Sequence, residues 1–424
     1  MNVLSSLKRG LALGVATLAL IGAGTAQSSD AQAMTADAKE AALKSLEEVL
    51  LRDAFVPGVS FARWPEMVKK RAAEFEKAKT RGQFADVVNG AMEEFGFSHI
   101  VLFPPSYGEQ RVTQRRSGIG IRITLESKGI RVMDVFPDSP ATDAGLQPGD
   151  LIIECDGKPT RVVADLQGDK GQKSTIVFVR GTEQISKEVT RRDYKTVIPE
   201  SVTWQGKTAV VRVPTFDMGY SRENVENIMA EVAAKSESVV LDLRGNPGGR
   251  VLNLQHLASF FLDSRAEPMG TFIGKMQVLA YEQKHGPTTD LQAIADASPF
   301  KTRASSNGLK LLLKQPVAVL IDGGSGSASE ILAAALGEIK SAPLVGTQTA
   351  GAVLASVVVP LAGDEGFWIQ YPLTDYLTIK GKRLEGNGVE PTHRAKLRTF
   401  EHDEPLETAI KLLQKPITPA KRAG

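Results

Sequence analysis

Two glycine-rich segments, each following a run of apolar residues, constrain the fold of this chain more than any other feature. The run Val239 to Leu243 leads into Arg-Gly-Asn-Pro-Gly-Gly, and the run Val317 to Ile321 leads, after one Asp, into Gly-Gly-Ser-Gly-Ser-Ala-Ser-Glu. Short apolar runs that end in turn residues are typical of buried strands. Because helical patterns alternate with such strands from about residue 205 onward, the sequence predicts an α/β fold with a partly parallel, helix-covered sheet.

One helix of this region is defined by its start and by its apolar face. Ser221 is a candidate N-cap, because a serine hydroxyl can accept a hydrogen bond from the first helical turn. A second helix is expected from the Ser-Ala-Ser-Glu segment through Leu336. The apolar residues at helical spacing after Ser221 are Val225, Ile228, Met229 and Val232.

Residues 35 to about 95 are rich in Ala, Lys and Glu, and their apolar residues have helical spacing. They predict a small helical domain. Its last segment, from Phe95 to Phe103, is expected to be a short apolar strand that carries the polar pair Ser98 and His99. The apolar faces of the two expected helices are Leu43, Leu46, Val49 and Leu50 in the first, and Met67, Ala72 and Phe75 in the second.

Short alternating patterns separated by turns run from about residue 117 to 197 and predict a small β domain. The string Ser-Pro-Ala-Thr-Asp-Ala-Gly-Leu-Gln-Pro-Gly-Asp, which starts at Ser139, precedes the apolar strand Leu151 to Cys155. Together with the Gly-Ile-Gly-Ile string upstream, it resembles a PDZ domain. The resemblance implies that backbone N–H groups bind a terminal carboxylate and that a strand edge accepts a peptide as an added strand. The residues of this carboxylate loop are Gly118, Ile119, Gly120 and Ile121.

Ser327 lies where the second buried strand turns through glycines toward a helix. Such a turn exposes the serine side chain, and the helix N-terminus favours negative charge nearby. The same segment also matches a capping box, in which Ser327 and Glu330 only stabilise the start of the helix. From these residues alone, both interpretations stay open.

The strings Leu-Asp-Leu-Arg-Gly-Asn-Pro-Gly-Gly and Gly-Ser-Gly-Ser-Ala-Ser-Glu-Ile together resemble the S41 peptidases, whose core has a crotonase-like α/β fold. With the PDZ segment, the resemblance covers roughly residues 90 to 395. It implies that Ser327 is the nucleophile and that the N–H groups of Gly248 or Gly249 and of Ala328 form the oxyanion hole. Adjacent glycines suit that role, because they let the main chain approach an acyl group closely.

The chain departs from the carboxyl-terminal processing proteases at two positions. That branch of the family uses a lysine base 25 residues after the serine and a glutamine four residues later. Here these positions are Ala352 and Ser356. The Ser–Lys dyad is therefore absent, and an activated serine needs another base, most often histidine.

The tricorn-core branch of S41 supplies such a histidine before the PDZ domain, directly after a serine, and orients the site with a glutamate. Ser98, His99 and Glu385 match that pattern, which implies His99 as general base and acid, with Glu385 and Ser98 as its hydrogen-bond partners. A histidine in an apolar segment can also be a structural residue. The reserve candidates for the base are His393, Lys380 and Lys382, whereas His256 is expected on a helix surface or interface.

The first thirty-odd residues have the pattern of a secretory signal peptide. Lys8 and Arg9 precede an apolar stretch of about 15 residues, which is shorter than the roughly 20 that a spanning helix needs. We expect cleavage after Ala33, with cleavage near Ala26 as the alternative. The protein is then periplasmic or secreted, without a stable membrane span. The single cysteine, Cys155, forms no internal disulfide and is expected to be a small buried side chain.

The expected organisation is a signal peptide (1–33), an N-terminal helical domain (34–108), an inserted PDZ domain (109–198), a crotonase-like S41 peptidase core (199–398), and a C-terminal helix and tail (399–424). The function implied is an exported serine endopeptidase acting on unfolded or tail-bearing proteins through a Ser–His–Glu arrangement, with PDZ recognition or gating. No metal or other cofactor is implied. The net charge of +2, without a long basic run, indicates no nucleic-acid partner.

Two rival functions remain open at this stage. One is a catalytically silent S41-fold binding protein, since the same core occurs in interphotoreceptor retinoid-binding protein and a fold does not guarantee a function. The other is a PDZ scaffold that tethers a different protease. The sequence also leaves open the physiological substrate, the cleavage preference and the oligomeric state, a homo-oligomer included.

Overall fold

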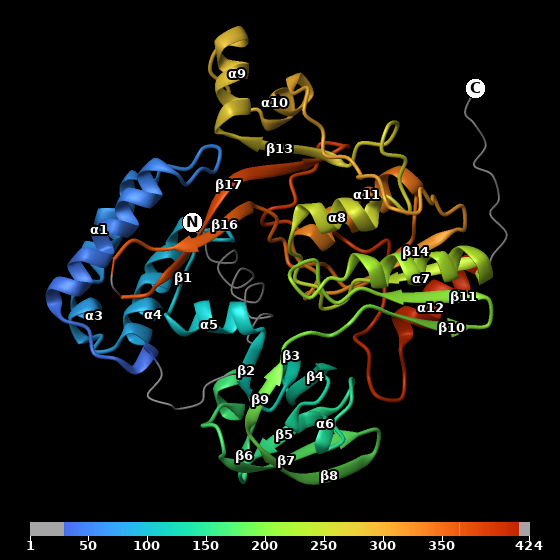
Figure 1. Ribbon diagram of the computed structural model, residues 1–424, viewed down its shortest axis with the longest axis horizontal. Coiled ribbons are helices and arrows are strands. Elements are labelled where there is room, and N and C mark those ends of the chain that lie inside the picture. Colours follow the sequence, from blue (N-terminus) through green and yellow to red (C-terminus); the bar gives the residue numbers. More distant parts are fainter. Residues whose placement is uncertain (1–28, 364, 415–424) are drawn as a thin grey trace, which may run out of the picture. The chain divides into compact units, whose positions relative to one another are not determined.

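The computed structural model describes residues 29–363 and 365–414 (Figure 1). Their contacts divide the chain into two compact units. Unit 1 comprises the chain through Val197 together with residues 270–302 and 351–387, and unit 2 comprises residues 198–269, 303–350 and those from 388 onward. Two segments of the expected peptidase core therefore belong to unit 1. The predicted domain boundaries stay predictions.

The N-terminal part of unit 1 consists of helices, as predicted. Thr35 and Thr80 cap the first and last of the four main helices by accepting hydrogen bonds from the first turn. The expected second helix is wrong in one respect: it is interrupted at Arg71, which places Phe75 in the core but leaves Ala72 exposed. The helices are α1 (Ala36–Arg52), α2 (Trp64–Lys70), α3 (Ala72–Lys77) and α4 (Arg81–Met92).

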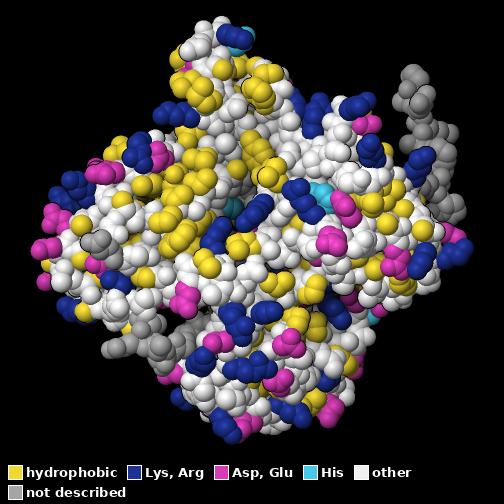
Figure 2. Space-filling model, in the orientation of Figure 1, with side chains coloured by type: hydrophobic (Ala, Val, Ile, Leu, Met, Phe, Trp, Pro, Cys, Tyr) yellow, Lys and Arg dark blue, Asp and Glu magenta, His cyan; other side chains and the backbone are white. Residues whose placement is uncertain are grey.

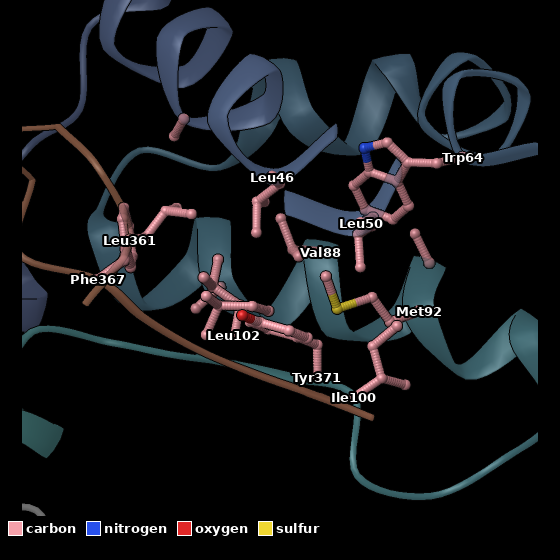
Figure 3. Packing of buried hydrophobic residues seen from close by; sticks show 14 of the residues in the cluster. Leu46, Leu50, Trp64, Val88, Met92, Ile100, Leu102, Leu361, Phe367 and Tyr371 are labelled. Carbon is pink, nitrogen blue, oxygen red and sulfur yellow. The ribbon is translucent and has the colours of Figure 1, made fainter. Parts of the chain in front are cut away.

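These helices pack on a four-stranded antiparallel sheet assembled from distant parts of the chain. Its order is β1-β17-β13, with β16 paired to β17. Leu46 and Leu50 of α1 are fully buried in the core between the helices and the sheet, and they lie over Val88 and Leu102 (Figure 3). The strands are β1 (Val101–Phe103), β13 (Gly270–Gly274), β16 (Ala355–Pro360) and β17 (Trp368–Thr378).

Two helices follow β13 within unit 1, α9 (Lys275–His285) and α10 (Leu291–Ala297). Ile294 and Ala295 of α10 pack with β13 and β17, whereas α9 buries none of its residues completely. Met276 on α9 and Phe300 after α10 are largely exposed. Elsewhere on the face drawn in Figure 2, basic and acidic side chains are interspersed, in keeping with the small net charge.

The β domain of unit 1 is a sheet of order β3-β4-β5-β7-β8, in which β6 pairs with β5, beside a two-stranded ribbon of β2 and β9. Its core contains Cys155, which is buried as predicted. Ser139 caps α6 (Pro140–Asp143). The strands are β2 (Arg115–Gly118), β3 (Ile121–Glu126), β4 (Gly129–Val135), β5 (Leu151–Cys155), β6 (Lys158–Pro159), β7 (Lys173–Arg180), β8 (Glu183–Thr190) and β9 (Arg192–Lys195).

Unit 2 contains a six-stranded sheet of order β10-β11-β12-β14-β15-β18. All neighbouring pairs from β11 onward are parallel and β10 is antiparallel, so the prediction of a partly parallel sheet is confirmed. Parallel strands place their carboxyl ends at one edge, where the loops after β12 and β14 meet. The strands are β10 (Ser201–Gln205), β11 (Thr208–Arg212), β12 (Ser238–Asp242), β14 (Val317–Ile321), β15 (Leu344–Gly346) and β18 (His393–Arg394).

The helices of unit 2 bear out the predicted pattern. Ser221 caps α7, and all four predicted apolar residues of its face are buried. Ala409 of α12 is buried against the sheet residues Val240 and Leu320. Within the described part of the chain, no helix has the length and hydropathy of a membrane span. The helices are α7 (Arg222–Lys235), α8 (Val251–Ala258), α11 (Ala328–Lys340) and α12 (Glu404–Gln414).

Candidate active site

Ser98 and His99 lie in a bend just before β1, and the prediction that they belong to a strand is wrong. Only Val101–Phe103 pair with β17. His99 has φ of +60°, a left-handed conformation that a non-glycine residue rarely adopts in a strand. Its positive φ interrupts the extended chain. The imidazole and the neighbouring hydroxyl can then meet at one point, which an extended strand would not allow because successive side chains point to opposite faces.

Glu385 is the hydrogen-bond partner of Ser98, and its catalytic role stays a prediction. Its carboxylate accepts hydrogen bonds from the Ser98 N–H (2.7 Å) and the Ser98 hydroxyl (2.9 Å). The N–H groups of Val353 (2.7 Å) and Leu354 (3.3 Å) donate to the same carboxylate. Glu385 is only 4% exposed. A buried carboxylate needs such donors, so its position is fixed by the surrounding backbone.

The hydrogen bonds determine which nitrogen of His99 carries the proton. Ser98 Oγ lies 2.5 Å from His99 Nδ1 and has a single hydrogen, which it donates to the carboxylate of Glu385. The hydroxyl must therefore accept from an Nδ1–H group. In the neutral imidazole this leaves Nε2 unprotonated, and Nε2 is then the atom able to take a proton from a nucleophile.

The protonation state of His99 suits a base. Burial lowers the pKa of the imidazole from its ordinary value of 6.5 to about 4, although part of the side-chain surface remains exposed. The charged form is disfavoured because it loses hydration. At neutral pH the imidazole is uncharged, as a general base requires.

Ser327 occupies the turn between β14 and α11, with φ of +51° and ψ of −116°. This conformation is costly for a residue with a side chain, by about 1–3 kcal/mol, and it is concentrated at functional sites. A strained strand-to-helix turn presents the hydroxyl at the top of the sheet. The backbone of Ser327 thus has the geometry of a nucleophile, and the role itself stays a prediction.

Of the two hydrogen bonds of a capping box, the one from the Ser327 N–H to the Glu330 side chain is present. The Glu330 carboxylate accepts the Ser327 N–H at 2.9 Å. The Glu330 N–H donates to the backbone carbonyl of Ser327, also at 2.9 Å, and the Ser327 hydroxyl makes no capping hydrogen bond. The cap therefore fixes the main chain of Ser327 and leaves its hydroxyl available.

The loop after β12 approaches this turn closely. A Cβ atom added to Gly248 would lie 2.6 Å from Ser327 Cβ and 3.0 Å from the Ala328 nitrogen. The Gly248 N–H donates to Asn246 Oδ1 at 2.9 Å, whereas no described residue of unit 2 accepts from the Gly249 N–H. Ala328 begins α11, so its N–H has no partner within the helix. Of the predicted oxyanion donors, Gly249 and Ala328 are the two with uncommitted N–H groups.

Two buried polar residues that the sequence analysis missed organise these loops. Asn246 orients the glycines after β12, because its amide also donates to Val213 O at 2.8 Å. Asp322 accepts hydrogen bonds from the Gly245 N–H (2.8 Å) and the Gly324 N–H (2.9 Å), which joins the two loops. The available signal for Asp322 was its position directly after an apolar run, and for Asn246 its position directly before the Pro-Gly-Gly turn.

The other candidates from the sequence lie elsewhere. Lys380, Lys382 and His393 are exposed, and Ala352 is partly exposed beside the N–H groups that bind Glu385. His256 is 2% exposed, so of the two expected positions the helix surface is wrong and the interface holds: the side chain is buried between α8 and α7. A hydroxyl and a carboxylate satisfy both of its ring nitrogens, Tyr220 Oη at 2.8 Å and Glu226 Oε1 at 3.2 Å.

The predicted carboxylate loop of the PDZ segment lies at a free edge of its sheet. β3 pairs with β4 on one side, and no other described strand pairs with it. Ile119 and Ile121 point into the core, and Gly120 fits against Ser139 so tightly that an added Cβ would lie 2.2 Å from the serine Cβ. An open edge strand can accept a peptide.

The candidate residues form two groups. Ser98, His99 and Glu385 meet in unit 1, and Ser327 meets the glycine loop in unit 2. Among the described residues, no cluster of three or more His, Cys, Asp or Glu side chains could hold a metal ion.

Comparison with known sequences identifies relatives of both segments. The family model for peptidase family S41 matches residues 207–395, and that for the PDZ domain matches residues 117–185. A probable CtpA-like serine protease of Staphylococcus epidermidis is 27% identical over 282 residues, and carboxy-terminal processing protease CtpA of Bacillus subtilis is 25% identical over 299 residues. The alignments cover 65% and 69% of this chain but 52% and 59% of those proteins, so the chain spans little more than half the length of these relatives.

Solved structures share the fold. The photosystem II D1 C-terminal processing protease aligns with a TM-score of 0.54 at 21% identity, covering 90% of this chain and 98% of its own. Mature CPAF aligns with a TM-score of 0.54 at 15% identity, covering 88% and 96%. Together with the family matches, these alignments confirm the predicted S41 fold with a PDZ domain. The chain is thus similar to peptidase family S41 over residues 207–395 and to the PDZ domain over residues 117–185.

Proposed function

We propose that this chain is an exported serine endopeptidase that hydrolyses peptide bonds in unfolded or tail-bearing proteins, with Ser327 as nucleophile and His99 as base. The observation that carries the proposal is the hydrogen-bonded chain from His99 Nδ1 through Ser98 Oγ to Glu385, which leaves Nε2 as a proton acceptor. The family lysine is absent at Ala352, and the imidazole supplies the base that an activated serine needs.

The proposed reaction is acyl transfer. Nε2 of His99 takes the hydroxyl proton of Ser327 as Oγ attacks the peptide carbonyl carbon, and the carbonyl π electrons move to oxygen. The N–H groups of Gly249 and Ala328 stabilise this oxyanion. The imidazolium returns its proton to the leaving amine as the C–N bond breaks, and water then hydrolyses the acyl-enzyme by the same steps. Ser98 and Glu385 stabilise the imidazolium through Nδ1–H.

The PDZ segment is proposed to bind the carboxyl end of a substrate at the β3 edge, or to gate access to Ser327. The exported location rests on the signal-like first residues, which lie outside the described part of the chain. Protein and peptide substrates fit both features, since secreted or periplasmic chains with free carboxyl ends are the partners such an enzyme meets.

A fluorophosphonate probe tests the nucleophile directly, because it phosphonylates only an activated serine. Labelling of the wild type that disappears in Ser327→Ala, with the thermal unfolding midpoint retained, supports the proposal. His99→Ala should slow labelling and peptide hydrolysis by about 10²–10⁴-fold. Lys380→Ala and Lys382→Ala serve as controls that should retain both, and Ala352→Lys should not increase either.

The rival functions predict different results. Equal labelling of wild type and Ser327→Ala removes this serine as nucleophile. Loss of activity in Lys380→Ala or Lys382→Ala, with His99→Ala nearly neutral, indicates a displaced Ser–Lys dyad instead. A wild type that neither labels nor cleaves unfolded proteins or tail peptides favours a silent binding protein or a PDZ scaffold. A crystal structure with His99 Nε2 within about 2.6–3.2 Å of Ser327 Oγ would complete the proposed pair.

A further inference from the structure

Glu330 lies under the proposed nucleophile and is fully buried. One oxygen, Oε2, accepts the Ser327 N–H, and the other, Oε1, accepts the hydroxyl hydrogen of Thr349. Because the Ser327 N–H is held in this way, the peptide plane that precedes the serine is fixed. The left-handed φ of Ser327 is thus supported by a side chain from the first turn of α11.

Thr349, which contacts Glu330, also forms hydrogen bonds with a second segment of the chain, at Val389. Its hydroxyl accepts the Val389 N–H at 2.7 Å, and its own N–H donates to Val389 O at 3.1 Å. The next residue, Ala350, donates its N–H to Ser325 O at 3.0 Å, two residues before the nucleophile. The segment that begins at Thr349 is therefore bound to the nucleophile turn at two points.

The chain passes from unit 2 to unit 1 after Ala350 and returns after Asn387. Hydrogen bonds join the outgoing and returning segments on both sides of this passage. In unit 2 the bonds are those of Thr349 and Val389, and in unit 1 the Gly386 N–H donates to Gly351 O at 2.8 Å. The same two segments then meet again at the Glu385 carboxylate, which accepts the Val353 N–H.

We propose that Glu330 and Thr349 are positioning residues for the nucleophile, which hold the Ser327 backbone in its positive-φ conformation and bind the nucleophile turn to the segments of Thr349 and Val389 within unit 2. The inference rests on the proposed function and deepens it. It accounts for a buried carboxylate and hydroxyl that touch no reacting atom.

The physical requirement behind this role is precision. A misplacement of about 1 Å of a reacting group can cost roughly 10²-fold in rate. Without the Glu330 contact, the Ser327 peptide would be free to relax from a strained conformation that costs about 1–3 kcal/mol. The hydroxyl and the Ala328 N–H would then move together, since both depend on the same turn.

The test uses Thr349, because removal of Glu330 would leave a cavity and two unpaired buried donors and could prevent folding. Thr349→Val keeps the shape and removes the hydroxyl, and Thr349→Ser restores it. A matched control is Thr208→Val. Thr208 is equally buried, and its hydroxyl bonds Ser238 Oγ at 2.8 Å in the same sheet. It begins β11 and therefore lies at the opposite ends of the parallel strands from the loops after β12 and β14.

The readouts are kcat and KM for a tail peptide, fluorophosphonate labelling rate, thermal unfolding, and hydrogen exchange of the peptide containing residues 325–330. Thr349→Val should lower kcat and the labelling rate by about 10²-fold with KM nearly unchanged. It should also speed exchange at 325–330. Thr349→Ser should recover both, and Thr208→Val should lose comparable stability while keeping wild-type kcat and exchange.

Two outcomes would overturn the inference. If Ser327→Ala is inert but Thr349→Val matches Thr208→Val in kcat and exchange, Thr349 has only a structural role and the proposed function stands. If Ser327→Ala labels like the wild type, the proposed function fails, and exchange still tests the contact without any need for activity. Equal protection of residues 325–330 in wild type and Thr349→Val then removes the positioning role as well.

Discussion

Ser98 Oγ lies 2.9 Å from Glu385 Oε2, although 287 positions of sequence separate the two residues. The serine hydroxyl stands between a carboxylate and the imidazole of its own neighbour, His99. The Ser98 hydroxyl has one hydrogen and donates it to Glu385. Its hydrogen bond with His99 therefore requires that the imidazole Nδ1–H donates to Ser98 Oγ. This contact therefore selects the tautomer of the proposed base.

Without the Ser98 hydroxyl, the His99 imidazole should no longer be held in the tautomer that carries its proton on Nδ1. We expect Ser98→Ala to lower kcat about 10²-fold, within the range typical of general-base assistance. Ser98→Thr is the matched control, because it keeps an oxygen at the same position. Steady-state kinetics with a tail peptide, together with the unfolding midpoint, check the result. Wild-type kcat in Ser98→Ala would show that the imidazole needs no such partner.

The pH dependence should reflect the low pKa of His99, which burial lowers to about 4. A base with that pKa stays unprotonated through mild acid, so kcat/KM should fall only as pH approaches 4, and not near the ordinary histidine value of 6.5. A pH–rate profile measures this directly. An acid limb centred near 6.5 would contradict the burial effect.

The same pKa shift has a consequence for stability with a definite sign. Between pH 6.5 and about 4 the unfolded imidazole binds a proton that the folded one does not. The folded state therefore loses stability as pH falls through this window, and the loss is constant below it. Urea unfolding of wild type and His99→Gln at several pH values isolates the effect. As the pH falls, the unfolding free energy of the wild type should decrease more than that of His99→Gln.

Side chains should not be tolerated at the two glycines after β12. A Cβ on Gly249 would lie 2.2 Å from the Asp217 nitrogen, and one on Gly248 would meet Ser327. Both residues also have positive φ. We expect Gly249→Ala to abolish labelling and to lower the unfolding free energy by about 1–3 kcal/mol. Gly323→Ala is the control, since its nearest neighbour, Gln348 O, is 4.0 Å away. Activity in Gly249→Ala would remove this loop from the oxyanion hole.

Recognition of a terminal carboxylate by the PDZ segment can be measured with the full chain in its Ser327→Ala form. A peptide with a free carboxyl end should bind at least about tenfold more tightly than its amide, because hydrogen bonds to a charged group are worth about 1.5–3 kcal/mol. Gly120→Ala should abolish the difference, since its Cβ would collide with Ser139. Equal affinities of acid and amide would leave only a gating role.

The mature N-terminus offers a test of the two cleavage sites. Asp30 accepts hydrogen bonds from the Ser106 N–H (2.9 Å) and hydroxyl (2.6 Å), and Gln32 O accepts the Arg81 N–H at 3.1 Å. Cleavage after Ala33 would remove these contacts, and cleavage near Ala26 would keep them. From the sequence we expect intact-mass measurement of the processed protein to show a start at Met34. A start near residue 27 would instead favour the alternative site, which keeps these contacts.

Local sequence patterns were sufficient wherever neighbouring residues determine the structure. The strands Leu151–Cys155 and Val317–Ile321 end at the predicted residues, and Ser221 caps a helix with the predicted buried face. Each of these features depends on the spacing of apolar residues and on a polar residue at a fixed distance along the sequence from them. Both can be recognised in a short stretch of sequence. The family strings around Gly248 and Ser327 belong to the same class, because the turn after a buried strand needs glycine at particular positions.

Only the tertiary structure decided the features that depend on distant partners. The segment at His99 is apolar enough for a strand, but the buried Glu385 carboxylate attracts Ser98 and the chain bends instead. For His256 the sequence left a helix surface or an interface open, and the hydrogen bonds that Tyr220 and Glu226 form with its ring nitrogens are what permit its burial. Likewise, Gly248 and Gly249 are equivalent in sequence, and Asn246 alone distinguishes their N–H groups. In each case the deciding energy is the pairing of a buried polar group, and its partner is set by the fold rather than by adjacent residues.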